Sequence, residues 1–509
     1  MASKSDVLIC TTLQCKTVQE MVTSMDTAKT EGADLAELRI DSLSVFDILL
    51  DVEKLIKQKS LPVIVSFRLG GKEDKRTCFR VLERALELNA DFIELELEVA
   101  SEFLANVNLD NYPNSKMIVS CHVDGTPIKD ELSLIVAQLQ STGADIIKLT
   151  FDAVYITDAA QVFHLLSHCQ VPLIACALGD RGLISQLLCP KFGGFLVYGT
   201  IGSNPVPGLP MLGTIRHVYK VENLNVDTKV FGLIANPVGH SKGPLLHNPA
   251  FHHAGYNGIY VPFRVDSMEE FFRIYSHPDF AGFSVGIPHK EGAVRCCDEV
   301  HPLAKSIGAV NTIVRRPTDG KLVGYNTDCE ASITAIEDAL RASRSANGGP
   351  SETSPLSGKL FVLVGAGGAG RALAFGAKSR GARLVIFNRN YARAKALALA
   401  VSGEALPYEE INGFCREKGM ILANATAVGM QPNTDQTPVA KEALGAYELV
   451  FDSVYTPRNT RLLREAEEVG AIVVSGVEMF IRQAIGQFNL FTDGKAPEEF
   501  MRKVVLTRF

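Results

Sequence analysis

The stretch Leu360-Phe-Val-Leu-Val-Gly-Ala-Gly-Gly-Ala-Gly370 decides the fold of the second half of the chain. Its apolar run leads directly into the pattern Gly-x-Gly-x-x-Gly, and a helical stretch over 371–379 and a second apolar run over 383–387 follow. This order predicts a parallel βαβ unit that binds a dinucleotide, because the glycines let the backbone approach a pyrophosphate and the helix N-terminus offers it free N–H groups. The residues of this turn that we expect to bind the cofactor are Gly365, Ala366, Gly367, Gly368, Ala369 and Gly370.

The residues after the second apolar run predict which dinucleotide binds to this Rossmann unit. An NAD-binding domain usually carries an acidic residue there, which binds the ribose 2′-hydroxyl. This chain has Asn388-Arg389-Asn390 instead, with Arg393 one helical turn further on. Arginine pairs well with a 2′-phosphate, so the sequence favours NADP(H), with NAD(H) as the alternative cofactor. The competing interpretation is that Arg389 is only a solvated residue at the end of a strand.

Length and composition limit what else the chain can be. Its 509 residues predict two to four domains, and 46% apolar with 21% charged residues is ordinary globular usage. A net charge of −6 gives no basic surface for nucleic acid, and no apolar run reaches the roughly 18 residues that span a bilayer. Eleven cysteines without a CxxC pair indicate a reducing compartment. No set of three or four histidines, cysteines or carboxylates has metal-site spacing, so we expect no metal.

The first 200 residues contain short apolar runs at intervals of about 23 to 30 residues. Stretches long enough for helices separate these runs, for example over 75–89 and 130–141. Eight strand–helix units of this length predict a closed parallel (β/α)8 barrel, and an open eight-stranded sheet is the weaker alternative. The predicted strands are 7–13, 34–40, 62–68, 92–98, 117–122, 145–149, 171–177 and 195–200.

Charged residues lie at the ends of these predicted strands, where barrel active sites form. An apolar strand has no packing reason to carry a lysine, yet Lys148 lies in one. A lysine near glutamates and a histidine suggests that Lys148 forms a Schiff base with a ketone while His122 moves protons. Alternatively, each charge belongs to a solvated strand end or an internal ion pair. The charged strand residues are Glu37, Arg39, Arg68, Glu94, Glu96, His122 and Lys148.

The runs "AELRID", "ELELEVAS", "VSCH", "GADIIKLT" and "KFGGFLVYGT" resemble the type I 3-dehydroquinate dehydratases over about residues 6–220. This resemblance implies that Lys148 is the Schiff-base lysine and that His122 is the general acid and base. The supporting residues that it implies are Glu37, Arg39, Arg68 and Glu96.

The chain departs from this dehydratase pattern at three substrate contacts. Where the family carries an arginine for the substrate carboxylate, this chain has Gln186. The last loop reads Pro205-Val-Pro-Gly-Leu209 in place of Ser-Ala-Pro-Gly-Gln. A lost charge-assisted hydrogen bond costs roughly 1.5 to 3 kcal/mol. We therefore expect a degraded barrel that keeps its fold and little of its dehydratase activity.

The second half resembles the shikimate and quinate dehydrogenases over about residues 229–509, in "NPVGHSKGPLLHN", "GFSVGIPHK", "GAVNT", "GYNTDC", "SVYTP" and "GVEMFIRQA". The fusion of both halves resembles the bifunctional plant enzymes. The resemblance implies that Lys290 and Asp328 are the catalytic pair at the hydroxyl that is oxidised, since hydride transfer leaves a proton to remove. It also implies Asn311 and Gln483 at ring hydroxyls, Tyr455 beside substrate and nicotinamide, and Asn424, Thr426 and Met430 along the nicotinamide.

Two glycines separate this chain from the usual shikimate dehydrogenase pattern, in which Ser-x-Ser and Ser-x-Thr-Ile-Pro-His-Lys present hydroxyls to the substrate carboxylate. Here these motifs read Gly239-His-Ser241 and Ser284-Val-Gly286-Ile-Pro-His-Lys. Both changes remove a hydroxyl and add space. Quinate has a tetrahedral C1 with a hydroxyl and needs that room, whereas C1 of shikimate is flat. The glycines therefore favour quinate, unless they merely serve turns.

We expect a barrel over 1–224, a substrate-binding α/β domain over 225–343 that 477–509 completes, and a Rossmann domain over 344–476. The expected function is an NADP(H)-preferring quinate dehydrogenase that interconverts quinate and 3-dehydroquinate, with weak residual dehydroquinate dehydratase and shikimate dehydrogenase activity. One alternative is a fully active bifunctional enzyme that also forms 3-dehydroshikimate and shikimate. The other is a non-catalytic sensor of a ring acid or nucleotide.

The remaining expectations concern assembly and location. We expect a monomer that binds small molecules and neither nucleic acid nor membrane. The resemblance implies the plastid stroma, and the cytosol is the alternative because the N-terminal residues lead into a strand without a visible transit peptide.

Overall fold

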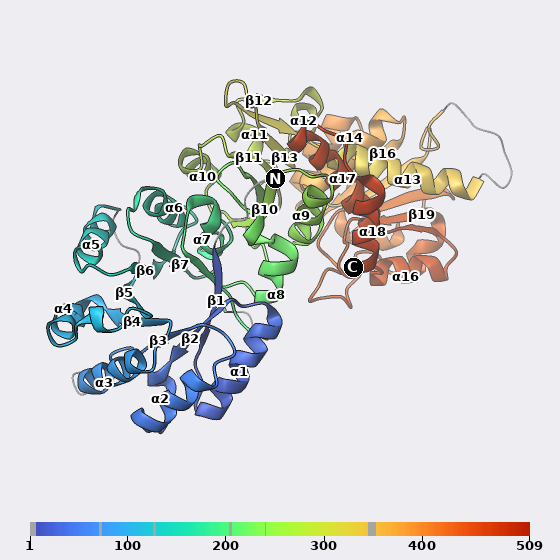
Figure 1. Ribbon diagram of the computed structural model, residues 1–509. Helices are drawn as coiled ribbons and strands as arrows, with labels where there is room; N and C mark the ends of the chain where they lie inside the picture. The colour runs from blue at the N-terminus through green and yellow to red at the C-terminus, as the bar shows by residue number, and fades with distance from the viewer. Residues whose placement is uncertain are drawn as a thin grey trace. The chain divides into compact units, whose positions relative to one another are not determined.

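Within the residues that it describes, the computed structural model contains one eight-stranded and two six-stranded β-sheets (Figure 1). The chain divides into two compact units, Met1–Val230 with Asn257–Asp279 and Phe231–Tyr256 with Phe280–Phe509. No helix in the described part of the chain is long and apolar enough to cross a bilayer. The structure describes residues 7–70, 74–125, 129–202, 206–239, 241–344 and 353–508.

The eight-stranded sheet is the predicted (β/α)8 barrel. Its strands follow the order β7-β6-β5-β4-β3-β2-β1-β8, and Phe195 N donates to Leu173 O at 3.0 Å between the two outer strands. All eight predicted strands are present, with ends that differ by at most three residues. The strands are β1 (Leu8–Leu13), β2 (Leu35–Arg39), β3 (Val63–Ser66), β4 (Phe92–Glu96), β5 (Lys116–Val123), β6 (Ile146–Asp152), β7 (Leu173–Leu178) and β8 (Leu196–Tyr198).

Helices separate the barrel strands, and α1 illustrates how the sequence delimits them. Thr17 Oγ1 accepts from Glu20 N at 3.2 Å and Glu20 Oε2 accepts from Thr17 N at 3.1 Å, which is a capping box. Gly32, at φ +102°, ends the helix. The helices are α1 (Val18–Glu31), α2 (Ile48–Lys57), α3 (Asp74–Glu87), α4 (Leu97–Asn106), α5 (Lys129–Ser141), α6 (Ala159–His168), α7 (Leu183–Leu187) and α8 (Leu212–Thr214).

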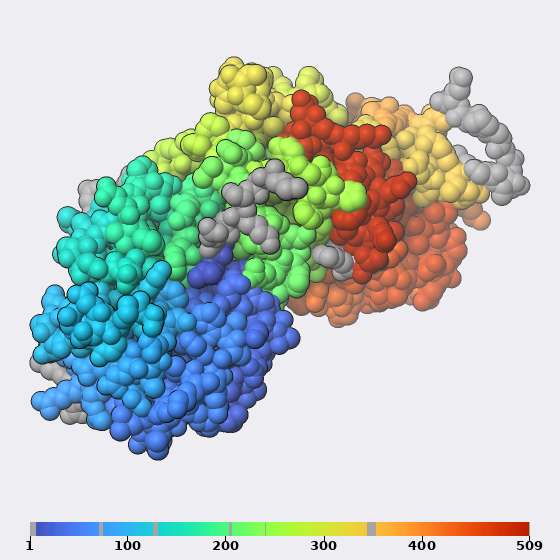
Figure 2. Space-filling view, viewed as in Figure 1, coloured from blue at the N-terminus to red at the C-terminus, as the bar shows by residue number. Residues whose placement is uncertain are grey.

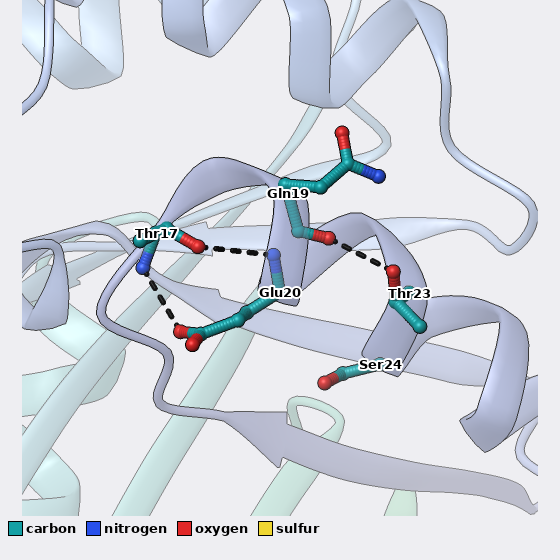
Figure 3. Close-up of a pocket in the computed structure, with 5 residues that line it drawn as sticks. All are labelled: Thr17, Gln19, Glu20, Thr23 and Ser24. Carbon is teal, nitrogen blue, oxygen red and sulfur yellow. Dashed lines mark hydrogen bonds between the residues drawn. The ribbon is translucent and has the colours of Figure 1, made fainter.

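A shallow hollow on the polar face of α1 carries no chemistry of its own. Most of its lining residues bond within the same helix, since Thr17 and Glu20 form the cap and Thr23 Oγ1 donates to Gln19 O at 3.0 Å (Figure 3). Ser24 Oγ accepts from Cys15 Sγ at 3.7 Å. We therefore assign this hollow to helix capping.

The second sheet has the order β10-β9-β11-β13-β14-β12, and it is mixed, since β13 runs antiparallel to both β11 and β14. Helix α17 packs on β11 and β13, and α18 packs on α9. The red C-terminal segment accordingly lies beside the green segment that contains α9 (Figures 1 and 2). The ring centroids of His253 and Phe500 are 4.1 Å apart, and these rings stack. The elements are β9 (Lys229–Ala235), α9 (Gly243–His253), β10 (Gly258–Arg264), α10 (Met268–Ile274), β11 (Phe280–Val285), α11 (Ala293–Cys296), β12 (Glu299–Val300), α12 (Pro302–Ile307), β13 (Thr312–Arg315), β14 (Leu322–Tyr325), α17 (Gly476–Thr492) and α18 (Glu498–Arg508).

The third sheet is parallel throughout, with the order β17-β16-β15-β18-β19-β20, and it confirms the predicted Rossmann fold. Phe361 and Leu363 on β15 face one apolar cluster while Val362 and Val364 face another, as expected for a sheet that helices cover on both faces. The elements are α13 (Asp328–Arg344), β15 (Leu360–Val364), α14 (Gly368–Ser379), β16 (Arg383–Asn388), α15 (Tyr391–Val401), β17 (Glu404–Pro407), β18 (Met420–Asn424), β19 (Tyr447–Asp452), α16 (Arg461–Glu468) and β20 (Ile472–Val474).

Candidate active sites

Lys148 lies inside the barrel on β6, between carboxylates from β2 and β4. Its Nζ is 3.1 Å from Glu37 Oε2 and 2.8 Å from Glu94 Oε2, and all three side chains are buried. A buried ammonium group is costly unless it is paired, and the two carboxylates supply that pairing. Burial alone would lower the pKa of Lys148, but Glu37 and Glu94 outweigh it and hold the pKa above its ordinary value. Lys148 is therefore a cation that must lose a proton before it attacks a carbonyl carbon.

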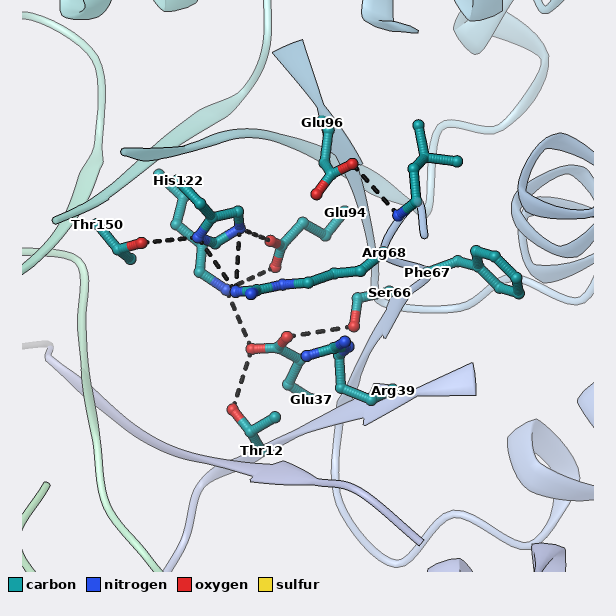
Figure 4. Close-up of polar contacts among 12 residues, drawn as sticks. Thr12, Glu37, Arg39, Ser66, Phe67, Arg68, Glu94, Glu96, His122 and Thr150 are labelled. Atoms are coloured by element: carbon teal, nitrogen blue, oxygen red, sulfur yellow. Dashed lines mark hydrogen bonds and ion pairs between the residues drawn. The ribbon is translucent and has the colours of Figure 1, made fainter. Parts of the chain in front are cut away.

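His122, on β5, lies beside this ion-pair cluster (Figure 4). Its Nδ1 is 2.7 Å from Thr150 Oγ1, and its Nε2 is 3.7 Å from Glu94 Oε1. Arg68 approaches the same ring, with Nη2 3.1 Å from His122 Nδ1. Burial would raise the pKa of Glu94, but Lys148 and His122 outweigh it and hold that pKa well below its usual range. A lysine, a carboxylate and a histidine thus stand together, and such groups can serve imine formation with proton transfer.

Two other predicted barrel residues lie outside this cluster. Arg39 pairs with Asp41, with Nη2 2.6 Å from Oδ2. Glu96 accepts a long hydrogen bond of 3.4 Å from Leu69 N. The second carboxylate that contacts Lys148, besides that of Glu37, belongs instead to Glu94, which the sequence analysis named among the charged strand residues but did not select for the site.

Gln186 is part of the barrel interior. It is 2% exposed, and its Oε1 accepts from Tyr198 N at 2.7 Å. The ring of Tyr198 lies 4.9 Å from Lys148 Nζ, so Gln186 is one residue removed from the lysine cluster. Leu209 packs against the apolar cluster inside the barrel, and Pro205 lies outside the described residues. Gln186 offers no positive charge, and a backbone N–H engages its carbonyl oxygen.

Lys290 and Asp328 form the expected pair in the second unit. Lys290 Nζ is 2.5 Å from Asp328 Oδ2, and the side chains are 19% and 4% exposed. Lys290 follows β11, and its carbonyl accepts from Val310 N at 2.8 Å, which fixes the backbone there. Asp328 is the first residue of α13. The lysine is thus partly open to solvent, while its carboxylate partner is buried and held at a helix end.

The residues expected at the substrate ring form two separate sets of contacts. Asn311 is buried, and its amide donates to Thr327 Oγ1 and accepts from Thr327 N, both at 2.8 Å. Gln483, on α17, is half-buried and donates to Phe480 O at 3.1 Å. The rings of Tyr455 and Phe480 are 4.8 Å apart. Asn311 is therefore hydrogen-bonded to Thr327, the residue before Asp328. Gln483 is hydrogen-bonded to Phe480, whose ring packs on that of Tyr455.

Gly239 and Gly286 differ in the space around them. A Cβ atom at Gly239 would meet no atom within 4 Å, so this position is open. At Gly286 a Cβ atom would lie 3.0 Å from Ala235 Cβ and 3.3 Å from Leu233 Cδ1. The expectation that both glycines add space holds at Gly239, whereas Ala235 on the neighbouring strand restricts the space at Gly286. Neither glycine has the positive φ at which turns require glycine, so turn geometry does not explain them.

The glycine turn has the form that a pyrophosphate site needs. Gly365 has φ +107°, and a Cβ atom at Gly370 would lie 2.1 Å from Gly365 O, so neither accepts a side chain. A Cβ atom at Gly367 would meet nothing within 4 Å, which leaves a cradle at the start of α14. At Gly368 a Cβ atom would lie 2.9 Å from Lys290 Cβ. The turn therefore packs directly against Lys290.

The residues after β16 surround the turn. Asn388 Oδ1 accepts from Ala366 N at 3.2 Å and so ties the strand end to the turn. Arg389 is exposed, and its positive charge acts on Tyr408, where it opposes the rise in pKa that burial causes. Arg393 forms an ion pair with Glu291 and donates to Ala366 O at 3.3 Å. These two arginines offer charge-assisted hydrogen bonds to a phosphate beside the turn.

Asn424 is the last residue of β18, and Thr426 and Met430 follow this strand. Asn424 Oδ1 accepts from Thr426 N at 3.0 Å and from Thr426 Oγ1 at 2.7 Å. Met430 is 37% exposed. The Asn424 amide also donates to Asp452 Oδ1 at 2.9 Å, and the sequence analysis did not consider Asp452.

Within the described ranges, no group of three or more histidine, cysteine, aspartate or glutamate side chains is arranged to hold a metal ion.

Both halves of the chain match known protein families. The model of the type I 3-dehydroquinases matches residues 9–225, and that of the shikimate dehydrogenase substrate-binding domain matches 233–313. The models of the shikimate/quinate 5-dehydrogenases and of the shikimate 5′-dehydrogenase C-terminal domain match 350–474 and 476–506. The chloroplastic bifunctional 3-dehydroquinate dehydratase/shikimate dehydrogenase of Arabidopsis thaliana is 50% identical over 512 residues, covering 99% of this chain and 85% of that protein. The chain belongs to this bifunctional family.

Other relatives of the bifunctional family match the second half alone. The NADP+-dependent shikimate dehydrogenase of Methanosarcina acetivorans is 40% identical over 290 residues, which cover 55% of this chain and 98% of that protein. The structure of Thermus thermophilus shikimate 5-dehydrogenase in complex with NADP(H) and shikimate is 31% identical and covers 55% of this chain and 100% of that one, with a TM-score of 0.46.

The dehydrogenase half of this bifunctional chain also holds polar residues that the sequence analysis missed. Ser284 Oγ donates to Gln487 Oε1 at 2.8 Å, and Gln487 Nε2 donates to Asn311 O at 3.3 Å. Gln487 lies one helical turn after Gln483 on α17, so the i,i+4 spacing could have indicated that both share a face. Gln487 thus links α17 to β11, the strand that ends just before Gly286, and to Asn311.

Proposed function

We propose that the second half of the chain is an NADP(H)-preferring quinate dehydrogenase that interconverts quinate and 3-dehydroquinate and acts more weakly on shikimate. The observation that carries this proposal is the open position at Gly239, whose backbone has no conformational need for glycine. A C1 hydroxyl requires such room, and the missing serine hydroxyl removes a donor for the shikimate carboxylate. Gly286 supplies no such open room, so Gly239 carries more of the argument.

Lys290 and Asp328 are the proposed proton-transfer pair. The nicotinamide cofactor supplies hydride transfer, which leaves the hydroxyl proton to be taken up. Lys290 Nζ is in contact with the buried Asp328 carboxylate, so a proton at Nζ has a partner 2.5 Å away. We assign ring-hydroxyl binding to Asn311 and Gln483, and the wall between substrate and nicotinamide to Tyr455.

The proposed cofactor preference is based on Arg389 and Arg393. The cradle at Gly367 fits a pyrophosphate, and the exposed Arg389 guanidinium is available to a 2′-phosphate. NADP(H) is therefore the preferred cofactor, with NAD(H) as the alternative. Asn424, Thr426 and Met430 line the nicotinamide side in this proposal.

For the barrel we propose a Schiff-base dehydratase site with weakened substrate binding. Lys148, His122 and Glu94 are assembled for imine chemistry. The neutral Gln186 replaces the arginine that the dehydratase family uses for the substrate carboxylate, and its carbonyl is already engaged by Tyr198. Loss of one charge-assisted hydrogen bond of roughly 1.5 to 3 kcal/mol lowers affinity by about one to two orders of magnitude.

A fully active bifunctional dehydratase/shikimate dehydrogenase is the second candidate. The intact cluster around Lys148 favours it, as does the 50% identity to the Arabidopsis thaliana protein. In this case the glycines and Gln186 would leave both activities at full strength.

Initial rates distinguish these candidates. The purified protein is assayed with quinate and shikimate, each with NADP+ and NAD+, and separately for dehydration of 3-dehydroquinate. The proposal requires a higher kcat/KM for quinate than for shikimate. A higher kcat/KM for shikimate together with rapid dehydration establishes the second candidate, and the absence of turnover in every assay leaves a ring-acid or nucleotide sensor.

We further propose a monomer in the plastid stroma, with domain boundaries after residues 224, 343 and 476 and with 477–509 completing the substrate-binding domain. Size-exclusion chromatography with light scattering tests the monomer. Limited proteolysis tests the boundaries, and a fluorescent fusion of the full-length precursor tests the location.

A further inference from the structure

Asp452, the last residue of β19, is a buried carboxylate with neutral partners. It is 0% exposed, and its Oδ1 accepts from Asn424 Nδ2 at 2.9 Å and Val454 N at 3.0 Å. Its Oδ2 accepts from Thr460 Oγ1 at 2.7 Å. In the described part of the chain no lysine, arginine or histidine pairs with this carboxylate. Asp452 is therefore a satisfied but electrically uncompensated buried anion.

Burying the negative charge of Asp452 costs desolvation free energy, and a neutral side chain could form the same hydrogen bonds. Burial raises the pKa of Asp452 to about 6, although Thr460, Val454 and Asn424 all act to lower it. An asparagine could keep its carbonyl on Asn424 and Val454 and donate its amide to Thr460 Oγ1, which has a free lone pair for it. A neutral residue of the same shape would thus hold the same loops at a lower desolvation cost.

Asp452 joins the two loops that we assign to the nicotinamide side of the cofactor. Asn424, which it holds, lies opposite it in the register of β18 and β19 and binds Thr426. Val454, which donates to Asp452, precedes Tyr455. The loops also bond each other, because Gln431 N donates to Thr456 O at 3.1 Å. The uncompensated charge therefore lies at the base of the proposed nicotinamide site.

We propose that the buried charge of Asp452 favours the oxidised, positively charged nicotinamide over the reduced, neutral one and so sets the relative affinity of the two cofactor forms. The inference rests on the proposed function in one respect, namely that this domain binds NADP(H). Asp452 acts through space and through Asn424, so it is a positioning and electrostatic residue and not a catalytic one.

The test compares dissociation constants of NADP+ and NADPH for the wild type and Asp452→Asn at pH 8, by calorimetry. The ratio of the NADP+ constant to the NADPH constant should rise about 3- to 30-fold in the variant, as expected for removing a charge from a partly buried site. Binding of 2′,5′-ADP, which lacks the nicotinamide, should not change. An unchanged ratio in the folded variant overturns the proposal.

Thr460→Val is the matched control, because it removes one donor to the carboxylate and keeps the charge. It also removes the Oγ1 acceptor that caps α16 at Leu463 N, so thermal unfolding must first show that the variant folds. Its ratio should equal that of the wild type. A shift as large as that of Asp452→Asn would assign the effect to loop position and would overturn the role of charge. If the wild type binds neither NADP+, NADPH nor 2′,5′-ADP, the proposed function itself fails, and this outcome differs from an unchanged ratio.

If Asp452→Asn does not fold, the wild type carries the test. The ratio is then measured at pH 8 and pH 5.5, across the pKa of about 6. Thr460, Val454 and Asn424, which together with burial set this pKa, carry no charge, and the pKa of Tyr455 on the adjoining loop is raised by burial, so Tyr455 stays neutral. Titration of the 2′-phosphate is common to both cofactors. The ratio should rise at pH 5.5, and a constant ratio overturns the proposal.

Discussion

Restoring two hydroxyls beside the proposed substrate C1 should convert the substrate preference from quinate towards shikimate. Gly239→Ser and Gly286→Thr each return a donor for the shikimate carboxylate, worth about 0.5 to 1.5 kcal/mol net. Together they should shift the ratio of specificity constants by about 1 to 3 kcal/mol, or roughly one to two orders of magnitude. The added side chains also occupy room that the C1 hydroxyl of quinate would use.

The structure predicts that these two substitutions differ in their effect on stability. Gly239→Ser enters open space and should leave the thermal midpoint unchanged. Gly286→Thr brings a Cβ atom to 3.0 Å from Ala235 Cβ, and such overpacking costs about 1 to 3 kcal/mol. Ala235→Gly removes the opposing methyl group and should recover stability in the triple variant. Ala235→Gly alone is the matched control, and it should not change the substrate ratio.

The assay measures kcat/KM for quinate and shikimate with NADP+, after thermal unfolding has shown that each variant folds. We expect Gly239→Ser to account for about half of the shift and the triple variant for all of it. A folded triple variant that keeps the wild-type ratio would refute the role of the two glycines and remove the main physical support for quinate.

Three further predictions follow from other parts of the structure. Arg389→Ala should raise KM for NADP+ by about one to two orders of magnitude, because it removes a charge-assisted hydrogen bond of roughly 1.5 to 3 kcal/mol. KM for NAD+ should stay nearly unchanged. Equal increases in KM for both cofactors would show that Arg389 does not bind the 2′-phosphate. Borohydride with 3-dehydroquinate should trap an imine on Lys148, while steady-state dehydration is far slower than dehydrogenation; a dehydration rate as high as the dehydrogenation rate contradicts the degraded barrel. Burial lowers the pKa of His247 to about 4 despite a hydrogen bond with Gln487, so the folded state favours the neutral ring. Stability should therefore fall between about pH 6.5 and pH 4 by up to about 3 kcal/mol, and His247→Gln should reduce the pH dependence of the urea midpoint; an unchanged dependence in a folded variant speaks against it.

The elements that the sequence predicted well depend on local pattern. The apolar runs of the barrel and the strand, glycine turn and helix around Gly367 follow from hydropathy and glycine spacing, and the structure contains them. Strand β6 nevertheless continues to Asp152, three residues beyond the predicted end, because Thr150 and Asp152 keep pairing with β7 although the apolar run has stopped. Strand ends therefore depend on the partner strand, which local hydropathy does not contain.

The residues that the sequence analysis missed depend on pairing between distant segments. Glu94 and Glu96 are two residues apart and therefore point to the same side of β4. Only the position of Lys148, on another strand, shows that Glu94 and not Glu96 contacts the lysine. The restriction at Gly286 comes from Ala235 on another strand. From the sequence alone, Asp452 resembles an ordinary solvated carboxylate at a strand end, and only the structure shows that it is buried. Sites of this kind depend on strand register and on packing between segments that are far apart in the sequence, so local sequence patterns do not reveal them.

The contact between Gly368 and Lys290 has a consequence for protein engineering. Helix α14, which we propose as the pyrophosphate site, begins against the aliphatic part of the lysine proposed for proton transfer, and a Cβ atom at residue 368 would lie 2.9 Å from Lys290 Cβ. A graft that exchanges this turn to change cofactor use must therefore keep glycine there. Any larger residue would push Lys290 away from Asp328, and the graft would then lose turnover even where it gained the desired nucleotide.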